Sequence, residues 1–263
     1  MLSFTSLYSG SSGNCLFVES NNSKILIDAG VSLKKIEKGL DSININPSDL
    51  DAVIVTHEHT DHIQSLGNLS KKFDLPVFAT AKTFDAMPKQ TEKISENNKN
   101  NFNVNEKFSI GDIEILPFQI PHDAVEPCGF TLFSDNKKIS IATDIGHITN
   151  DILKRIDGSE FILLESNYDS NVLKYTKYPF KLKERIAGPT GHLSNKIAGQ
   201  TINYLIKSGL KTAILGHLSK ESNFPELAYQ TVVDEILSDG TNIDNFHLSV
   251  ASRDFPGKSV TIN

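Results

Sequence analysis

The sequence has few of the features that mark disulfide-rich or membrane proteins. Its two cysteines, Cys15 and Cys128, are too few for a disulfide framework, and we expect both to be reduced thiols. No stretch approaches the roughly 18 consecutive apolar residues of a membrane span. The first ten residues, MLSFTSLYSG, lack the basic and long apolar regions of a signal peptide. These absences predict a cytoplasmic protein with no membrane partner.

Positive charge is also scarce, with 26 basic against 32 acidic residues and a net charge of -6. This balance argues against a wholly basic, non-specific nucleic-acid coat. Residues 172–187 depart from this charge balance. They include five basic residues and a single acidic one, Glu184, with aromatic residues interleaved among them. Such a stretch indicates either a nucleic-acid surface or a solvated helix whose apolar side packs on the core.

Short runs rich in valine, isoleucine and phenylalanine recur along the chain and are typical of strands. They lie at residues 15–20, 24–29, 51–56, 75–80, 113–120, 128–134, 138–143, 160–165, 212–216 and 247–252. Helical spacing of apolar residues appears at 63–73, 193–209 and 224–237. The polar residues 95–107 predict a surface loop.

Capping residues support two of these helices. Ser194 is a candidate N-cap and Gly209 a candidate stop for the second helix, and Pro225 lies near the first turn of the third. Because the early strands follow one another like hairpins, the pattern favours an α/β fold of two mixed sheets, face to face, with helices outside. There is no internal repeat and no long linker, so we expect one domain over residues 1–263.

The most informative stretch is AVIVTHEHTDHIQSL, which begins at Ala52. Within it, His57, His59, Asp61 and His62 directly follow an apolar run that reads as a buried strand. Imidazole nitrogens and carboxylate oxygens suit zinc, iron or manganese. Four such side chains, aimed in two directions, predict two metal ions and further ligands elsewhere in the chain.

Other ligand-type residues also stand where predicted strands end. Asp28 lies at the end of the strand at 24–29, and His122, Asp144 and His217 follow the strands at 113–120, 138–143 and 212–216. His247 falls within a strand pattern and is expected to be structural, whereas His147 could line the mouth of the site. His192 precedes a helix start and could donate a proton or hydrogen bond to a phosphate.

Taken in order, this set resembles the five motifs of the metallo-β-lactamase superfamily, over nearly the whole chain. The resemblance implies an αββα sandwich with a dinuclear site at one edge of the sheets. It assigns His57, His59 and His122 to one metal ion, and Asp61, His62 and His217 to the other. Asp144 would bridge the two ions, and Asp28 would orient the histidine-rich loop through hydrogen bonds. The ions would be Zn²⁺ or Mn²⁺, with iron also compatible.

Five further stretches are similar to the WalJ/YycJ (VicX) group of this superfamily: SLYSGSSGNCLFVES, IPHDAVEPCGF, LLESNYD, GHLSN and LGHLSKESN. That similarity implies a cytoplasmic metal-dependent nuclease, with 5′-to-3′ exonuclease activity on double-stranded DNA. The similarity also implies that the protein has a role beside mismatch repair or two-component signalling. The step of 73 positions from Asp144 to His217 is too short for the extra domain of related RNA-processing nucleases, so we expect an open cleft that admits duplex ends.

The expected chemistry is in-line attack on phosphorus by a hydroxide activated between the metals. Asp61 would orient or deprotonate the attacking water, and His192 would assist the leaving group. Asn14, Ser219 and Asn223 are candidate phosphate contacts. Two other functions stay open at this point: hydrolysis of a small-molecule ester, thioester, lactone or cyclic phosphodiester, and a non-catalytic regulatory role in which metals only stabilise the fold.

Overall fold

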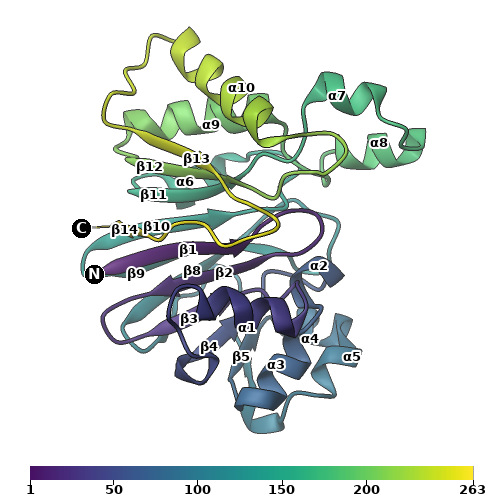
Figure 1. Cartoon of the computed structure of the whole chain (residues 1–263), viewed down its shortest axis with the longest axis vertical. Helices are drawn as coiled ribbons and strands as arrows, with labels where there is room; N and C mark the ends of the chain where they lie inside the picture. The colour runs from purple at the N-terminus through teal and green to yellow at the C-terminus, as the bar shows by residue number, and fades with distance from the viewer. Residues whose placement is uncertain (263) are drawn as a thin grey trace.

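The chain folds into two seven-stranded sheets packed face to face, with helices on both outer faces (Figure 1). The computed structural model describes residues 1–262. The predicted α/β class with two mixed sheets is confirmed, and each of the ten predicted strand segments contains a strand.

The first sheet lies in the lower half of Figure 1 and combines both ends of the described chain. Its spatial order is β14 (Val260–Ile262), β1 (Leu2–Tyr8), β2 (Cys15–Glu19), β3 (Lys24–Ile27), β4 (Ala52–Ile54), β5 (Val77–Ala79) and β6 (Lys99–Asn101). The second sheet has the order β13 (His247–Val250), β12 (Thr212–Gly216), β11 (Phe161–Glu165), β10 (Lys137–Ala142), β9 (Cys128–Ser134), β8 (Ile113–Gln119) and β7 (Phe108–Ile110).

The helices divide between the two outer faces in chain order. Those that follow strands of the first sheet are α1 (Leu33–Asp41), α2 (Thr60–Ile63), α3 (Leu66–Phe73), α4 (Ala81–Ala86) and α5 (Pro88–Thr91), with two 3₁₀ turns at Pro47–Asp49 and Glu96–Asn98. Those that follow strands of the second sheet are α6 (Asn150–Ile156), α7 (Ser170–Tyr175), α8 (Phe180–Ile186), α9 (Asn195–Lys207) and α10 (Pro225–Ser238). Within residues 1–262, no helix combines the length and apolar character needed to cross a membrane.

Alternation of side chains along the strands produces three apolar layers. Phe4 and Ile54 from the first sheet meet Phe130 and Phe161 from the second in the layer between the sheets. The outer face of the first sheet packs against α1, α3 and α4, and the outer face of the second against α6, α9 and α10. The two sheets are therefore held to each other by a shared core.

Strand direction brings one end of many strands to the same edge of the molecule. β3, β4 and β5 are parallel neighbours in the first sheet, and β10, β11 and β12 are parallel neighbours in the second. β8 runs in the direction of β10, because both are antiparallel to β9. Residues that follow these strands are thus collected along one edge.

Two of the three predicted helices have the expected boundaries. Ser194 caps α9 by accepting a hydrogen bond from the N–H of Ile197, and Gly209 follows its end with a φ of 105°. Pro225 is the first residue of α10.

The prediction of one continuous helix over 63–73 was wrong. This segment contains the last residue of α2 and, after a break, the whole of α3. The N–H of Ser65 donates to the carbonyl of Ala29 at the break, so the chain docks on the loop after β3 there.

The prediction of a loop over 95–107 was also partly wrong, since this segment contains β6, which pairs in parallel with β5. An edge strand is held by backbone hydrogen bonds and needs no apolar pattern, so its polar sequence concealed it.

Candidate metal centre

The histidine-rich loop begins three residues after β4 and leads directly into α2. His57 and His62 are completely buried, while the carboxylate of Asp61 keeps 27% of its surface exposed. His59 lies in extended conformation at the N-cap of α2, and the N–H of His62 donates back to its carbonyl. The loop therefore directs its imidazoles inward and leaves one carboxylate open to solvent.

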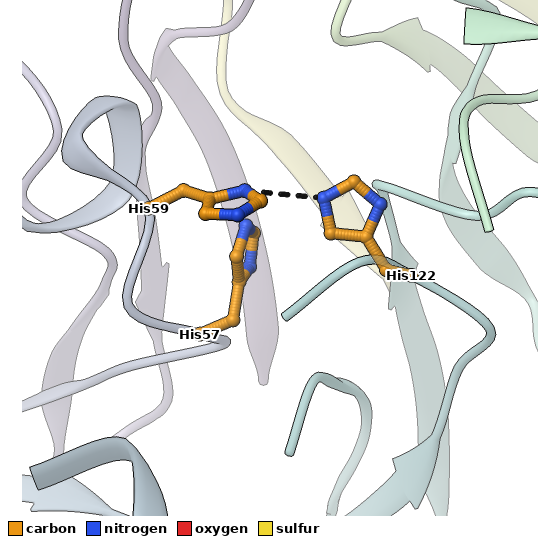
Figure 2. A group of neighbouring side chains, drawn as sticks. All are labelled: His57, His59 and His122. Atoms are coloured by element: carbon orange, nitrogen blue, oxygen red, sulfur yellow. Dashed lines mark hydrogen bonds between the residues drawn. The ribbon is translucent and has the colours of Figure 1, made fainter. Parts of the chain in front are cut away.

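Three histidines from both sheets form the first group of possible ligands (Figure 2). His57 and His59 come from the loop after β4, and His122 approaches from the loop after β8. Nδ1 of His59 lies 3.2 Å from Nε2 of His122, and one ligand atom from each residue lies within 4.8 Å of the others. This spacing suits three ligands of a single metal ion.

A second group lies beside the first and consists of Asp61, His62 and His217. The carboxylate of Asp61 is 3.6 Å from Nε2 of His62 and 3.4 Å from Nε2 of His217. Asp144 is close to both groups, because its carboxylate lies 3.2 Å from Nε2 of His62 and 3.7 Å from Nε2 of His122. The structure therefore brings together all seven residues that the sequence suggested as ligands.

Hydrogen bonding within this cluster is incomplete. Among the described residues, Nε2 of His57, Nε2 of His217 and Oδ2 of Asp144 are buried polar atoms without a hydrogen-bond partner. Buried polar atoms left without partners are costly, and native proteins retain few of them. Because these three are nitrogen and oxygen atoms of the types that bind divalent cations, the residues present fit a metal centre.

Electrostatics in the cluster favour the same interpretation. Burial alone would raise the pKa of Asp144, but the positive charges of His217 and His62 outweigh it and hold that pKa well below its usual value. Burial and the neighbouring His62 push the pKa of His57 well below its usual value, which keeps its imidazole neutral. Neutral imidazoles and ionised carboxylates are the forms that bind metals, so His57 and Asp144 already have the required form. Burial lowers the pKa values of His62 and His217, but the charge of Asp144 outweighs it and raises both well above the usual value, so these two ligands would release protons on binding a metal ion.

The backbone turns sharply where the strands end. Asp28, Asp144 and His217 have φ angles of 64°, 58° and 54°, in the left-handed region that residues other than glycine rarely adopt. Such conformations persist where the surrounding structure imposes them, and they gather at functional sites. Here they follow β3, β10 and β12.

A buried network holds His62 in place. Its Nδ1 lies 2.7 Å from Oδ2 of Asp28, and the same oxygen accepts a hydrogen bond from the hydroxyl of Thr56 at 2.9 Å. The other oxygen of Asp28 accepts the backbone N–H of Thr56 at 2.9 Å. Asp28 thus orients the histidine and the loop that carries it, which is the arrangement expected of a group that supports a metal ligand.

Sequence reasoning missed Glu165, the last residue of β11. Its side chain is fully buried, with Oε1 at 2.8 Å from Nδ1 of His192 and 3.0 Å from Nδ1 of His217. Its Oε2 accepts the backbone N–H groups of Ile145 and Leu193. Because it ends the strand predicted at 160–165, the criterion that selected the other strand-end residues could also have found it.

The other predicted histidines occupy different positions. His192 is half-buried beside the centre, with Nδ1 directed at Glu165. His147 is exposed and its Nδ1 lies 2.8 Å from the carbonyl oxygen of Pro189, in the loop that leads to His192. His247 begins β13, as the sequence predicted.

The three candidate phosphate contacts are all buried, and their polar groups have partners within the protein. The amide of Asn14 donates to the carbonyl of Gly10 and lies 3.2 Å from Nε2 of His62. Asn223 donates to the carbonyls of Ser166 and Asn167. The hydroxyl of Ser219 accepts the N–H of Ser222. Their contact with substrate stays a prediction.

A conserved-domain comparison agrees with this geometry. The family model described as a beta-lactamase superfamily domain matches residues 23–218, which include every strand-end residue of the centre. The chain belongs to the β-lactamase superfamily.

Within the β-lactamase superfamily, the chain falls in the WalJ/YycJ group. It is 37% identical to the exodeoxyribonuclease WalJ of Streptococcus pneumoniae over 235 residues, covering 89% of this chain and 87% of the relative. It is 38% identical to the exodeoxyribonuclease YycJ of Bacillus anthracis over 231 residues, covering 88% of each.

A solved structure of the metallo-β-lactamase fold protein YhfI from Bacillus subtilis superposes with a TM-score of 0.70. The sequence identity is 16%, and the match covers 98% of this chain and 100% of that one. This likeness shows the fold. Together with the His/Asp clusters, membership of the superfamily identifies a metal-dependent hydrolase, as the sequence predicted.

Proposed function

We propose that this β-lactamase-superfamily protein is an exodeoxyribonuclease that uses two divalent metal ions and digests double-stranded DNA in the 5′-to-3′ direction. The observation that carries the metal chemistry is the convergence of seven ligand-type side chains in which three buried atoms lack hydrogen bonds. The WalJ and YycJ relatives are exodeoxyribonucleases, which supports DNA as the substrate.

In this proposal, His57, His59 and His122 hold one ion and Asp61, His62 and His217 the other, with Asp144 shared between them. We infer Zn²⁺ or Mn²⁺, and iron is also compatible with these donors. When bound, the ions supply Lewis acidity toward a phosphate and activation of water. All other steps depend on groups of the chain itself.

Two residues, Asp61 and His192, act on the reacting groups, and Glu165 and Asn14 position them. The carboxylate of Asp61 is partly open to solvent and orients the attacking water as well as binding metal. Glu165 holds Nδ1 of His192, which turns Nε2 of that ring away from the carboxylate, where it can assist the leaving group. Asn14 holds the loop at 10–14 against Asp61, whose carbonyl accepts the backbone N–H of Asn14.

The test follows the digestion of 5′-labelled and 3′-labelled duplexes by protein reconstituted with Zn²⁺ or Mn²⁺. Release of mononucleotides from the 5′ end, absent in Asp61→Ala, is the expected result. Release from the 3′ end would overturn the polarity. No cleavage of duplex or single-stranded DNA with any metal, together with rapid turnover of a model ester, would move the assignment to a small-molecule hydrolase.

The similarity to the WalJ/YycJ group also leads us to propose a cytoplasmic location and a role beside mismatch repair or two-component signalling. A raised spontaneous mutation frequency in a deletion strain is the result expected of a repair role. An unchanged frequency with an altered cell-wall stress response would instead favour signalling.

A further inference from the structure

The segment that contains α7 and α8 differs in charge from the rest of the molecule. In Figure 1 the two helices project at the upper right, on the side where α2 lies. Five of their exposed residues, Lys174, Tyr175, Lys177, Phe180 and Lys181, make up what we call the α7–α8 surface. Over residues 172–187 there are five basic residues and one acid, the exposed Glu184, whereas the whole chain has a net charge of -6.

Folding does not require the two aromatic residues of this surface. Tyr175 is 80% exposed and Phe180 is 73% exposed. A small apolar cluster beneath them holds the helices together, with Leu173 and Ile186 at its centre. Because large aromatic side chains are usually buried, two exposed rings in a segment with three exposed lysines indicate a binding surface.

The lysines of the surface also remain available. Among residues 1–262, Lys174, Lys177 and Lys181 make no ion pair with a carboxylate. The ammonium of Lys174 lies 5.6 Å from the ring centre of Tyr175. A cavity of about 410 Å³ between the helices is lined in part by Lys174 and Phe180. An anionic ligand with flat apolar groups fits this combination.

The surface is joined to the metal centre by short connections. The carbonyl of Ile186, the last residue of α8, accepts the backbone N–H of His192 at 2.8 Å. Arg185 forms an ion pair with Asp123 at 2.6 Å, and Asp123 follows His122 in the chain. The segment that carries the α7–α8 surface is therefore in direct contact with the two loops that carry His122 and His192.

We propose that the α7–α8 surface binds a single-stranded segment of nucleic acid, with lysines on the phosphates and bases stacked on Tyr175 and Phe180. The inference rests on the proposed nuclease function. A single strand is favoured over a duplex because paired bases hide their faces, whereas unpaired bases can stack on exposed rings. Digestion of one strand of a duplex uncovers such a segment in the other strand.

Binding of a fluorescent oligothymidylate with phosphorothioate linkages, followed by anisotropy on the full-length metal-loaded protein, tests the proposal. The double variant Tyr175→Ala/Phe180→Ala should weaken binding at least about fivefold, the lower end of the loss expected from removing one base-stacking ring. Lys177→Gln/Lys181→Gln should reduce the slope of log affinity against log salt by about 0.7 for each lost phosphate contact.

Matched controls are available elsewhere on the molecule. Lys34→Gln/Lys38→Gln makes the same charge change on α1, and Tyr204→Ala removes a half-exposed ring from α9. Neither should alter binding. Hydrolysis of a small phosphodiester should be unchanged in all these variants, which would show that the fold and the metal centre are intact.

Unchanged oligothymidylate affinity in Tyr175→Ala/Phe180→Ala would overturn the proposal. So would equal losses for duplex and single-stranded DNA, because they would indicate a general polyanion surface. Lysine-dependent binding to anionic phosphatidylserine vesicles, without aromatic-dependent binding to DNA, would assign the surface to membranes instead. Strand binding without any cleavage of DNA would overturn the proposed nuclease and leave the surface as inferred.

Discussion

Two glutamates at opposite ends of β11 show how differently one strand can use the same residue type. Glu160 precedes the strand, is partly exposed, and pairs with Lys211 at 2.6 Å. Glu165 ends the strand, is fully buried, and faces His192 and His217. The difference follows from strand direction, because only the carboxyl ends of the parallel strands reach the edge where ligands gather.

Substitutions at the edge that carries Glu165 should impair metal binding and activity, whereas substitutions at the edge that carries Glu160 should have little effect on either. Four substitutions test this contrast, taken from the largest expected effect to the smallest.

Asp144→Ala should abolish metal-dependent hydrolysis, with a loss greater than the roughly 100-fold upper value for residues that only orient a ligand. It removes the carboxylate closest to both ligand groups and leaves His62 and His217 without its charge. Metal content by mass spectrometry and rates on labelled DNA measure the effect. Stoichiometric metal with near-normal rates would show that Asp144 is not a shared ligand.

Gly30→Ala should disturb the histidine-rich loop. A Cβ at this position would lie 1.6 Å from the backbone carbonyl oxygen of Asp61, so the two loops must separate. We expect metal affinity to fall and the unfolding midpoint to drop. Gly257→Ala is the matched control, since its Cβ would meet its nearest atom at an ordinary 3.6 Å. Equal behaviour of the two variants would contradict the close packing of the loops.

Glu165→Gln should lower metal affinity by about 10- to 100-fold, because Glu165 orients His217 through Nδ1. Competition with a chromophoric chelator measures that affinity. Glu160→Gln, at the other end of the same strand, is the control and should leave affinity unchanged. If both substitutions had the same effect, the contrast between the two ends of β11 would be wrong.

Glu160→Gln should have the smallest effect, visible only in the pH dependence of stability. The hydrogen bond from Lys211 lowers the pKa of Glu160 from its usual 4.5. A lowered folded-state pKa stabilises the protein above about pH 4.5, and that contribution is lost as the pH falls through the folded-state value. The variant should therefore be less stable above this window by under about 1 kcal/mol and equal to wild type below it. Urea unfolding at several pH values provides the measurement.

The metal centre was more predictable than the topology around it. His57, His59 and Asp61 could be recognised because ligand-type residues after a buried strand are a local pattern. The strand β6 could not, since its polar residues are held at the edge by backbone pairing with β5. The helix break before α3 also depends on a distant partner, the carbonyl of Ala29.

The segment 172–187 shows the same division between local and tertiary information. Its charges and aromatic residues were evident, but the sequence allowed a single helix with its apolar side on the core. The structure instead forms α7 and α8 around a small cluster of their own, which leaves Tyr175 and Phe180 exposed. The exposure of a side chain depends on the tertiary structure. Here it favours the first of the two interpretations of this segment, a nucleic-acid surface, over a helix packed on the core.

By itself, the sequence determined the chemistry of this protein: which ligand types it carries, that they follow strands, and the superfamily whose motifs they match. Those features are local, because a strand pattern and the residues after it are read within about ten positions. Only the tertiary structure decided that these side chains lie within reach of one another, why Glu165 joins them, and where the cationic helices lie relative to the centre. These depend on parallel register, burial and left-handed turns at strand ends, which bring together residues far apart in the chain.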